Sequence, residues 1–389
     1  MAVCLSHGGP SLYRTVDSDP RMLVATIDGI VFLERSGVRW SVASHGLEGL
    51  HISALMIEPG GGRVFAGTHP QGRDGLLEGR PLAARNGSVR DGRGGGLFAS
   101  DDGGKTWTHK DAGIGGDNYF VLNCTGNPEG MLVYAGTEPA HLYVSRDLGE
   151  SWEELSALRE VPNVQSWTYP GPPHVAHVKN VAFDPRNSGV IYAAVEVGGL
   201  FKSTDAGKSW TPLSGIDDDV HRVTVSPIHP EQVFVATGAG LYRSFDEGTT
   251  WERLTDREDR IAYPDALILH PEEDGLAYTA GAIAAPGGWR DTHDADARIA
   301  RTRDHGYAWE VLGNGLPEHI RGNVEAMAMN LWSDGFHLYA GTTDGDVFAS
   351  DDGGDTWDTI VTGLAPISVG GHFKRLRAPG EPAPATTAR

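Results

Sequence analysis

Cysteine is nearly absent from this 389-residue sequence, which contains only Cys4 and Cys124. Two cysteines cannot form a disulfide framework, so the fold must be held together by its core. Long apolar runs are also missing, because no stretch approaches the roughly 18 residues that a transmembrane helix needs. The first ten residues, MAVCLSHGGP, lack the basic and apolar regions of a secretory signal. We therefore expect a cytoplasmic protein.

Positive charge is scarce as well. The 32 lysines and arginines are outnumbered by 52 aspartates and glutamates, which gives a net charge of −20. This balance argues against nucleic acid and against anionic membranes as partners. Turn-forming and aromatic residues are plentiful instead, with 53 glycines, 23 prolines and 10 tryptophans. That composition favours many short strands joined by turns over a helical protein.

One motif, Ser/Thr-x-Asp-x-Gly-x-x-Trp, occurs six times. Its copies span 100–107, 145–152, 203–210, 244–251, 302–309 and 350–357. A shortened seventh copy covers Glu34 to Trp40. From Trp40 to Trp357, the tryptophans of successive copies are 41 to 67 residues apart. A period of this length fits one four-stranded propeller blade per repeat.

These copies resemble the Asp-box (BNR) repeats of sialidases and of the VPS10-like and photosystem II assembly-factor propellers. The resemblance implies an all-β, seven-bladed β-propeller with four-stranded antiparallel blades and with all Asp-box turns on one face. It makes the boxes structural, because the carboxylate accepts backbone N–H groups across a tight turn and the glycine adopts a positive φ. The predicted structural residues are Asp102, Asp147, Asp205, Asp246, Asp304 and Asp352.

The strand pattern is clearest in the fourth unit, where we expect strands at 177–183, 190–195, 200–204 and 209–213. The inner strand of the first unit is either Ser11–Val16 or Ile367–Leu376. We favour the C-terminal choice, because it would close the ring and remove two exposed edges. The prediction is therefore a single domain over residues 1–376. The Pro- and Ala-rich segment 377–389 is expected to be a disordered tail.

Three insertions identify the face that could carry function. In an up-and-down blade, the insertions at 70–95, 156–176 and 282–297 all fall on the face opposite the Asp-boxes. Glu138 and Glu196 end second strands on this face, and His177 and His221 begin inner strands there. We predict that these four residues converge as catalytic groups or as ligands of a divalent metal ion. Predicted ligand-binding residues around them are His51, His69, Tyr119, Trp167, His174, Tyr263, Arg290 and Glu325.

Three functions are compatible with this arrangement. The first is a hydrolase or lyase that acts on a small, sugar-like ligand, with Glu138 and Glu196 as the acid/base pair. The second is an enzyme that uses Zn²⁺, Mn²⁺ or Fe²⁺ on the histidines and glutamates. The third is a scaffold without catalysis that binds a protein through the insertions at 70–95 and 282–297. The Arg-Ile-Pro motif of sialidases is absent, and isolated polar residues in a propeller channel are often merely solvated.

Overall fold

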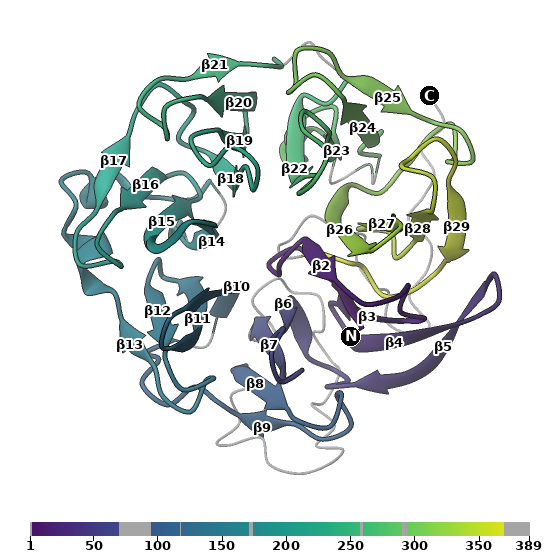
Figure 1. The fold of residues 1–389 in the computed structure, drawn as a ribbon, viewed down its shortest axis with the longest axis horizontal. Helices are drawn as coiled ribbons and strands as arrows, with labels where there is room; N and C mark the ends of the chain where they lie inside the picture. Colours follow the sequence, from purple (N-terminus) through teal and green to yellow (C-terminus); the bar gives the residue numbers. More distant parts are fainter. Residues whose placement is uncertain are drawn as a thin grey trace.

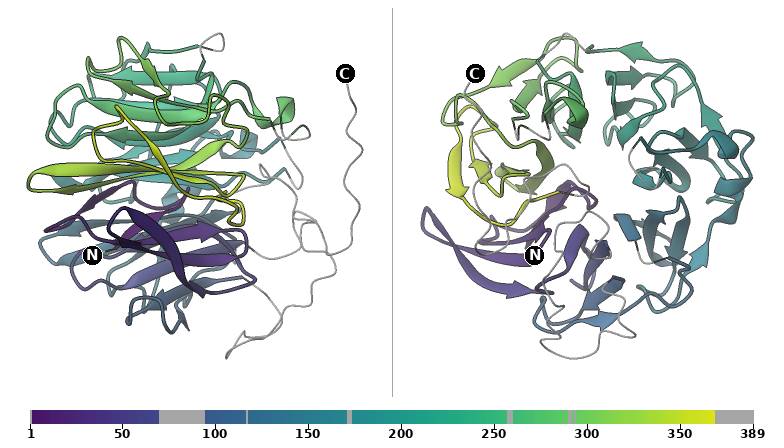
Figure 2. Two further views of the ribbon diagram at one scale, coloured as in Figure 1. Left: turned by 90° about the vertical axis from the view of Figure 1, so that its right-hand side faces the viewer. Right: turned by 180° about the vertical axis from the view of Figure 1, so that it is seen from behind.

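The computed structural model describes residues 2–69, 95–116, 118–170, 174–256, 260–289, 292 and 294–368. Their strands form seven small sheets around one central channel, as Figure 1 shows. Seen from the side, the ring has the thickness of one blade (Figure 2). Helical structure in these ranges is limited to three 3₁₀ segments, η1 (Ser156–Glu160), η2 (Val164–Ser166) and η3 (Pro286–Gly288). The predicted seven-bladed, all-β architecture is confirmed.

Blades 2 to 6 follow one antiparallel pattern, in which four consecutive strands run from the channel to the rim. Blade 2 contains β6 (His51–Ile57), β7 (Val64–His69), β8 (Leu97–Ser100) and β9 (Thr108–His109). Blade 3 contains β10 (Asn118–Asn127), β11 (Gly130–Glu138), β12 (Leu142–Ser145) and β13 (Glu153–Glu154). Blade 4 contains β14 (Val178–Asp184), β15 (Asn187–Val195), β16 (Gly199–Ser203) and β17 (Thr211–Leu213), close to the predicted ranges.

The remaining blades complete the ring. Blade 5 contains β18 (Val220–Val225), β19 (Val233–Thr237), β20 (Gly240–Ser244) and β21 (Glu252–Arg253). Blade 6 contains β22 (Tyr263–Leu269), β23 (Ala277–Ala282), β24 (Arg298–Thr302) and β25 (Glu310–Leu312). Blade 7 contains β26 (Val324–Trp332), β27 (Gly335–Thr342), β28 (Val347–Ser350) and β29 (Asp358–Val361). Within the ranges given above, no helix is long and apolar enough to cross a membrane.

The inner strand of blade 1 differs from both predicted alternatives. It is β1 (Val3–Leu5), which pairs in parallel with β3 (Arg21–Thr26), followed by β4 (Gly29–Ser36) and β5 (Arg39–Gly46). The favoured C-terminal strand is therefore wrong for this position. The three β1 side chains are at most 1% exposed, so the first residues of the chain gain a full apolar environment by occupying this edge.

The other alternative, Ser11–Val16, contains a strand that belongs to a different blade. This strand is β2 (Leu12–Arg14), which pairs in parallel with β26 and makes blade 7 five-stranded. Near the C-terminus, Ile367 is buried beside Leu5 and lies outside any strand. Residues 369–376 and the predicted tail 377–389 lie outside the described residues.

The segment between β1 and β2 crosses the central channel. Gly8 donates to Ser53 O in blade 2 and accepts from Leu122 N in blade 3. On the other side of the channel, Arg222 of blade 5 donates to His7 O and to Ser11 Oγ. A Cβ on Gly8 would lie 1.9 Å from Phe120 O, so only glycine fits at this close approach. The N-terminal segment 6–11 therefore ties together blades that are distant in the ring.

The Asp-boxes have the predicted structural role. In blade 2, Asp102 Oδ1 accepts from Thr106 N (2.9 Å) and Asp102 Oδ2 accepts from Thr106 Oγ1 (2.7 Å). Ser100 Oγ accepts from Gly104 N (2.8 Å) across the turn, and Gly104 has a φ of +92°. Carboxylate-to-backbone bonds of this kind recur at the other five aspartates. The shortened copy in blade 1 forms a plain hairpin between β4 and β5 instead.

For the described residues, the two faces of the ring are also as predicted. Arg63, in the turn between the first two strands of blade 2, donates to Leu148 O and pairs with Glu150 in the Asp-box turn of blade 3. The insertion after β13 lies on the opposite face, since Thr168 N donates to Val197 O between β15 and β16. The 282–297 insertion lies on that face too, through Ala297 N and Ile320 O. Residues 70–94 are outside the described ranges.

A candidate site at the channel mouth

A β-bulge near the start of the inner strand in blades 2 to 7 shapes the channel mouth, the end of the channel opposite the Asp-boxes. The pairing of each inner strand with its neighbour skips one residue in blades 2 to 7. A bulge re-aims the side chain of the extra residue. The skipped residues are Ser53, Phe120, Lys179, His221, Asp265 and Glu325. The residues two positions earlier are His51, Asn118, His177, Asp219, Tyr263 and Asn323. Side chains from both sets meet at the mouth.

His177 lies between the two predicted acid/base glutamates. Its Nε2 forms a short hydrogen bond with Glu196 Oε2, and its Nδ1 faces Glu138 Oε2 at 3.5 Å. The imidazole is 1% exposed and stacks on Phe120, with ring centroids 3.6 Å apart. Three of the four predicted catalytic residues therefore converge. However, the imidazole fills the space between the carboxylates, where a glycosidase would hold its substrate.

Lys179 supplies the positive charge at the centre of the mouth. Its Nζ donates to Glu196 Oε1 at 2.6 Å and lies 3.9 Å from Asp265 Oδ1. Burial alone would lower the pKa of Lys179, but Glu196 and Asp265 outweigh it and raise the pKa. Burial would likewise raise the pKa of Glu196, and Lys179 and His177 hold it well below its usual range. The lysine and the glutamate are thus both charged.

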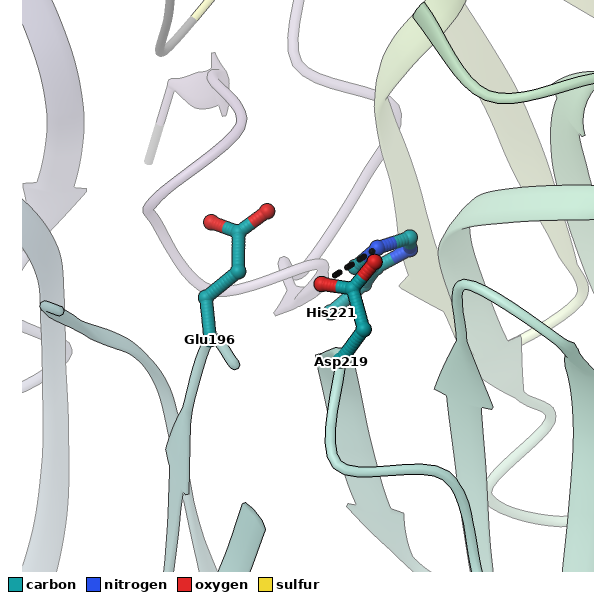
Figure 3. A group of neighbouring side chains, drawn as sticks. All are labelled: Glu196, Asp219 and His221. Atoms are coloured by element: carbon teal, nitrogen blue, oxygen red, sulfur yellow. Dashed lines mark ion pairs between the residues drawn. The ribbon is translucent and has the colours of Figure 1, made fainter. Parts of the chain in front are cut away.

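Beside this pair, Glu196, Asp219 and His221 offer donor atoms that all lie within 4.8 Å of one another (Figure 3). A backbone bridge between Glu196 and Asp219 brings the fourth and fifth blades together at this point. His221 Nε2 faces Asp219 Oδ1 at 3.4 Å. Neither atom has a hydrogen-bond partner among the described residues, and both are buried. His221 Nδ1 donates to Pro264 O (2.7 Å), so Nε2 is the ring nitrogen that faces the Asp219 carboxylate.

Opposing effects set the charge of this second group. Burial and Lys179 would lower the pKa of His221, but Asp219 outweighs them and raises it. For Asp219, burial would raise the pKa, and His221 outweighs it and lowers the pKa. The Asp219 side chain is 25% exposed, against at most 4% for those of Glu196 and His221. The group therefore opens to solvent at Asp219.

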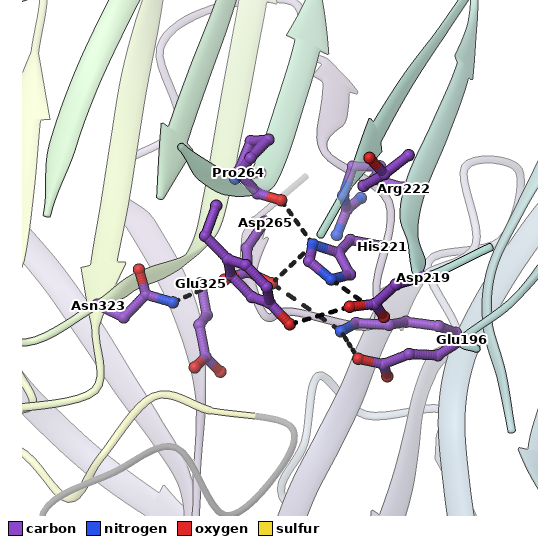
Figure 4. A network of polar contacts seen from close by, with 12 residues as sticks. Glu196, Asp219, His221, Arg222, Pro264, Asp265, Asn323 and Glu325 are labelled. Carbon is purple, nitrogen blue, oxygen red and sulfur yellow. Dashed lines mark hydrogen bonds and ion pairs between the residues drawn. The ribbon is translucent and has the colours of Figure 1, made fainter. Parts of the chain in front are cut away.

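The network continues across the channel to blades 6 and 7, as Figure 4 shows. Asp265 Oδ2 accepts from Asn323 Nδ2 at 2.6 Å, and Asp265 Oδ1 lies 3.7 Å from His221 Nδ1. His7, from the N-terminal segment, lies 4.0 Å from the same oxygen. Burial, together with Lys179 and Arg222, lowers the pKa of His7 well below its usual range, so this histidine is neutral.

The predicted ligand-binding residues fall into three groups. Tyr263 belongs to the cluster formed by Glu196, Asp219 and His221, since its hydroxyl donates to Asp219 Oδ2 at 3.3 Å. His51 and Glu325 lie further round the ring and are joined through Ser368, which accepts from His51 through its carbonyl and donates to Glu325 Oε2. His69 packs against His51, with ring centroids 4.7 Å apart.

The other predicted ligand-binding residues do not reach the cluster. Tyr119 is fully buried in the apolar core between blades 2 and 3, because the bulge turns Phe120 towards the channel in its place. Trp167 packs on Phe201, with ring centroids 5.2 Å apart. His174 is exposed and has a φ of +63°. Arg290 lies outside the described residues.

Sequence reasoning missed two charged residues of the site, Lys179 and Asp219. A signal for them exists in the repeat itself, because the six inner strands can be aligned on their bulge position. Reading every strand at that position and two residues earlier finds both. The structure divides the predicted metal ligands into two groups. The predicted set is His177, His221, Glu138 and Glu196. His177 and Glu138 contact each other, while Glu196 and His221 lie with Asp219.

Comparison with known proteins supports the architecture. The BNR/Asp-box repeat matches residues 98–109, which contain the box of blade 2. The structure is similar to the GH74 xyloglucanase from Xanthomonas campestris, with a TM-score of 0.63 and 17% identity. That alignment covers 94% of this chain and 56% of the xyloglucanase. An ancestral GH74 enzyme gives a TM-score of 0.54 and 18% identity, covering 69% of this chain and 36% of the enzyme.

A third similar structure is YCF48 bound to D1 peptide, with a TM-score of 0.50 and 15% identity. It covers 90% of this chain and 88% of YCF48. This chain therefore spans nearly all of YCF48 but at most about half of the GH74 enzymes. No curated protein sequence matches significantly. Together these similarities show an Asp-box β-propeller, and at such low identity they show the fold alone.

Proposed function

We propose that the channel mouth is the catalytic centre of a hydrolase or lyase that acts on a small polar ligand of sugar type, with a divalent metal ion on Glu196, Asp219 and His221. The observation that carries this proposal is the approach of His221 Nε2 to Asp219 Oδ1, which form a 3.4 Å ion pair in the mouth and have no hydrogen-bond partner among the described residues. A histidine whose other ring nitrogen is held by a backbone carbonyl is the usual form of a metal ligand.

The charge of the cluster supports a cation. Five carboxylates lie at the mouth, from Glu138, Glu196, Asp219, Asp265 and Glu325, against Lys179 and His221, whose pKa Asp219 raises, with His7 neutral. Buried negative charge in such excess is costly unless cations offset it. One imidazole with two carboxylates suits Zn²⁺, Mn²⁺ or Fe²⁺. Such an ion would polarise a carbonyl group or lower the pKa of a bound water.

The chain's own residues position the ligands and admit the substrate. Lys179 holds Glu196 through one oxygen, and each carboxylate oxygen keeps a further lone pair for a second partner. Tyr263 donates to Asp219 Oδ2, which leaves Oδ1 directed at His221. A substrate approaches from the exposed side of Asp219. Tyr169, whose ring lies 5.2 Å from that of His177, forms one wall of this approach.

The test is metal content combined with turnover. After chelation and reconstitution with Zn²⁺, Mn²⁺ or Fe²⁺, the protein should retain about one ion per chain by elemental analysis. Asp219→Asn should weaken retention at least about tenfold and abolish metal-stimulated hydrolysis of a panel of aryl glycosides and aryl esters. Asp218→Asn is the matched control, because its carboxylate is exposed and outside the group. A wild-type protein that retains no ion, or an Asp219→Asn variant that equals it, would disprove the metal centre.

A second candidate is a binding scaffold without catalysis. The observation in its favour is length, because this chain and the peptide-bound YCF48 structure cover about nine tenths of each other. Under this alternative the buried polar cluster fixes the blades around the channel, and a protein partner binds the insertions of the same face. Absence of both metal retention and turnover would favour the scaffold.

A further inference from the structure

A cavity lies in the channel on the side of the Asp-box face. It has a volume of about 420 Å³, within the usual range for small-molecule sites. Its walls are the later parts of the inner strands of blades 2 to 6 and the N-terminal residues Gly9 to Arg14. Most of the lining is apolar and includes Ile57, Phe183, Val223, Val225, Leu267 and Leu269.

Arg222 is the charged group at the inner end of this cavity. It is the first residue of β18 to line the cavity, and β18 runs from the channel mouth towards the Asp-box face. Its side chain is buried, with the residue 5% exposed. The guanidinium donates to His7 O and to Ser11 Oγ (3.0 Å), while its Nε has no partner among the described residues.

The charge of Arg222 is poorly compensated compared with that of other buried arginines. Arg243 pairs with Glu252 at 2.6 Å, and Arg301 pairs with both Glu310 and Asp355. No carboxylate in the described parts of the chain lies within 4.0 Å of Arg222. Asp265 acts on it from further away and already contacts Asn323 and His221. A buried guanidinium without an anion is costly, so an anion from outside the chain would be favourable here.

We propose that this cavity binds a small amphipathic carboxylate, with its carboxylate on Arg222 and its apolar body along the inner strands. The polar end is specified as a single negative charge, because Arg222 is the buried cation of the cavity. Arg14, at the rim, is already paired with Glu272 at 2.5 Å. The apolar body follows from the valine, leucine and phenylalanine side chains of the walls.

This site is separate from the proposed catalytic centre. The N-terminal segment crosses the channel between them, with His7 near Asp265 on one side and Gly9 to Arg14 lining the cavity on the other. Arg222 and His221 are neighbours in sequence, yet the bulge directs His221 to the mouth. The two proposals can therefore fail independently.

The test compares two ligands of equal length that differ in charge. Octanoate should bind the wild-type protein at least about tenfold more tightly than 1-octanol in titration calorimetry at pH 7, because only octanoate provides a charge-assisted bond to Arg222. Arg222→Met should remove this preference and leave 1-octanol binding nearly unchanged. Ala182→Phe, which fills part of the cavity, should weaken both ligands.

Arg253→Met is the matched control, because Arg253 also donates to backbone carbonyls, those of Thr255 and Ala239, but lies on the outer strand of blade 5. It should keep the wild-type preference for octanoate. Equal affinities of the wild type for octanoate and 1-octanol, or octanoate binding that survives Ala182→Phe intact, would overturn the proposal. This outcome does not depend on whether Arg222→Met folds. Metal retention at the mouth should be the same in the Ala182→Phe variant as in the wild type.

Discussion

The two faces of the propeller are held by different kinds of interaction. On the Asp-box face, each carboxylate bonds to residues three or four positions later in its own turn, and the arrangement recurs six times. At the channel mouth, Lys179 bonds to Glu196, 17 residues away in the same blade, and Asp265 bonds to Asn323, 58 residues away in the next blade. Local, repeated bonds make each box nearly independent. The mouth is one network that exists only once the ring has closed.

The surroundings of the charged carboxylates also differ between the two faces. The box carboxylates face solvent, and N–H and O–H donors stabilise their charged form. The mouth carboxylates of Glu196 and Asp265 are buried and share one lysine. Loss of one box contact should therefore cost little, whereas loss of the mouth cation should cost much. Four predictions test this comparison, from the largest expected effect to the smallest.

Lys179→Met should lower the free energy of unfolding by about 3–5 kcal/mol, because it leaves buried carboxylates without their cation. The measurement is urea denaturation at pH 7. Lys202→Met in the same blade is the control, since Lys202 pairs with the partly exposed Glu247 at 2.8 Å. It should cost at most about 1 kcal/mol. Equal losses in the two variants would show that the mouth is no more charge-dependent than the surface.

Gly207→Ala should cost about 2 kcal/mol, because the residue has a φ of +86° and its new Cβ would lie 2.7 Å from Leu155 Cδ1. The neighbouring Ala206 also has a positive φ, of +60°, without being glycine. Ala206→Gly should therefore stay within about 1 kcal/mol of the wild type. Thermal unfolding of the two variants side by side checks this contrast. A Gly207→Ala protein as stable as the wild type would contradict the tight packing of the box.

Acid should weaken the Asp-box face through its aspartates. Hydrogen bonds from Ser151 and Ser209 lower the pKa of Asp147 and Asp205 to about 2. An unfolded aspartate titrates near about 3.9, so the stability from these groups is complete above that pH and is lost as the pH falls towards 2. The stability difference between the wild type and Asp205→Asn should therefore shrink between pH 4 and 2. A difference that stays constant over this range would refute the assignment.

Ala308→Ser should produce the smallest change, a gain of about 0.5–1 kcal/mol. Ala308 occupies the box position where Ser209 Oγ, in blade 4, donates to Asp205 Oδ2 at 2.6 Å. In blade 6 the corresponding Asp304 accepts a hydrogen bond from Ala308 N, and alanine has no hydroxyl group to donate a second one. Ser209→Ala should lose a similar amount, and chemical denaturation of both variants should give shifts of opposite sign. Shifts of the same sign would show that the boxes are not equivalent.

The sequence predicted the Asp-box face well because its information is local. Aspartate, glycine and tryptophan at fixed spacing specify one turn, and Gly207 is required there whatever the rest of the chain does. The strand pattern of blade 4 was predictable for a similar reason, since its turns and apolar residues lie within 40 residues of each other. At the mouth, His177 and Glu196 were found because they stand at the ends of those same strands.

The rest depended on contacts between distant segments. β1 is three residues long, too short for a pattern to identify, and its parallel partner appears only in the folded ring. Lys179 and Asp219 were missed because a bulge, which shifts the register by one residue, decides which side chain enters the channel.

By itself, then, the sequence determined how many blades form, where each Asp-box turn lies and which face carries the insertions, because each of these follows from short-range spacing. Tertiary structure alone decided that the N-terminal segment crosses the channel, with the mouth cluster on one side and the Arg222 cavity on the other. The physical reason is that burial and charge compensation are properties of the closed ring. In the sequence, the residues around Arg222 look like those of any strand. Arg222 becomes a buried cation only when His7, Ser11 and five inner strands surround it.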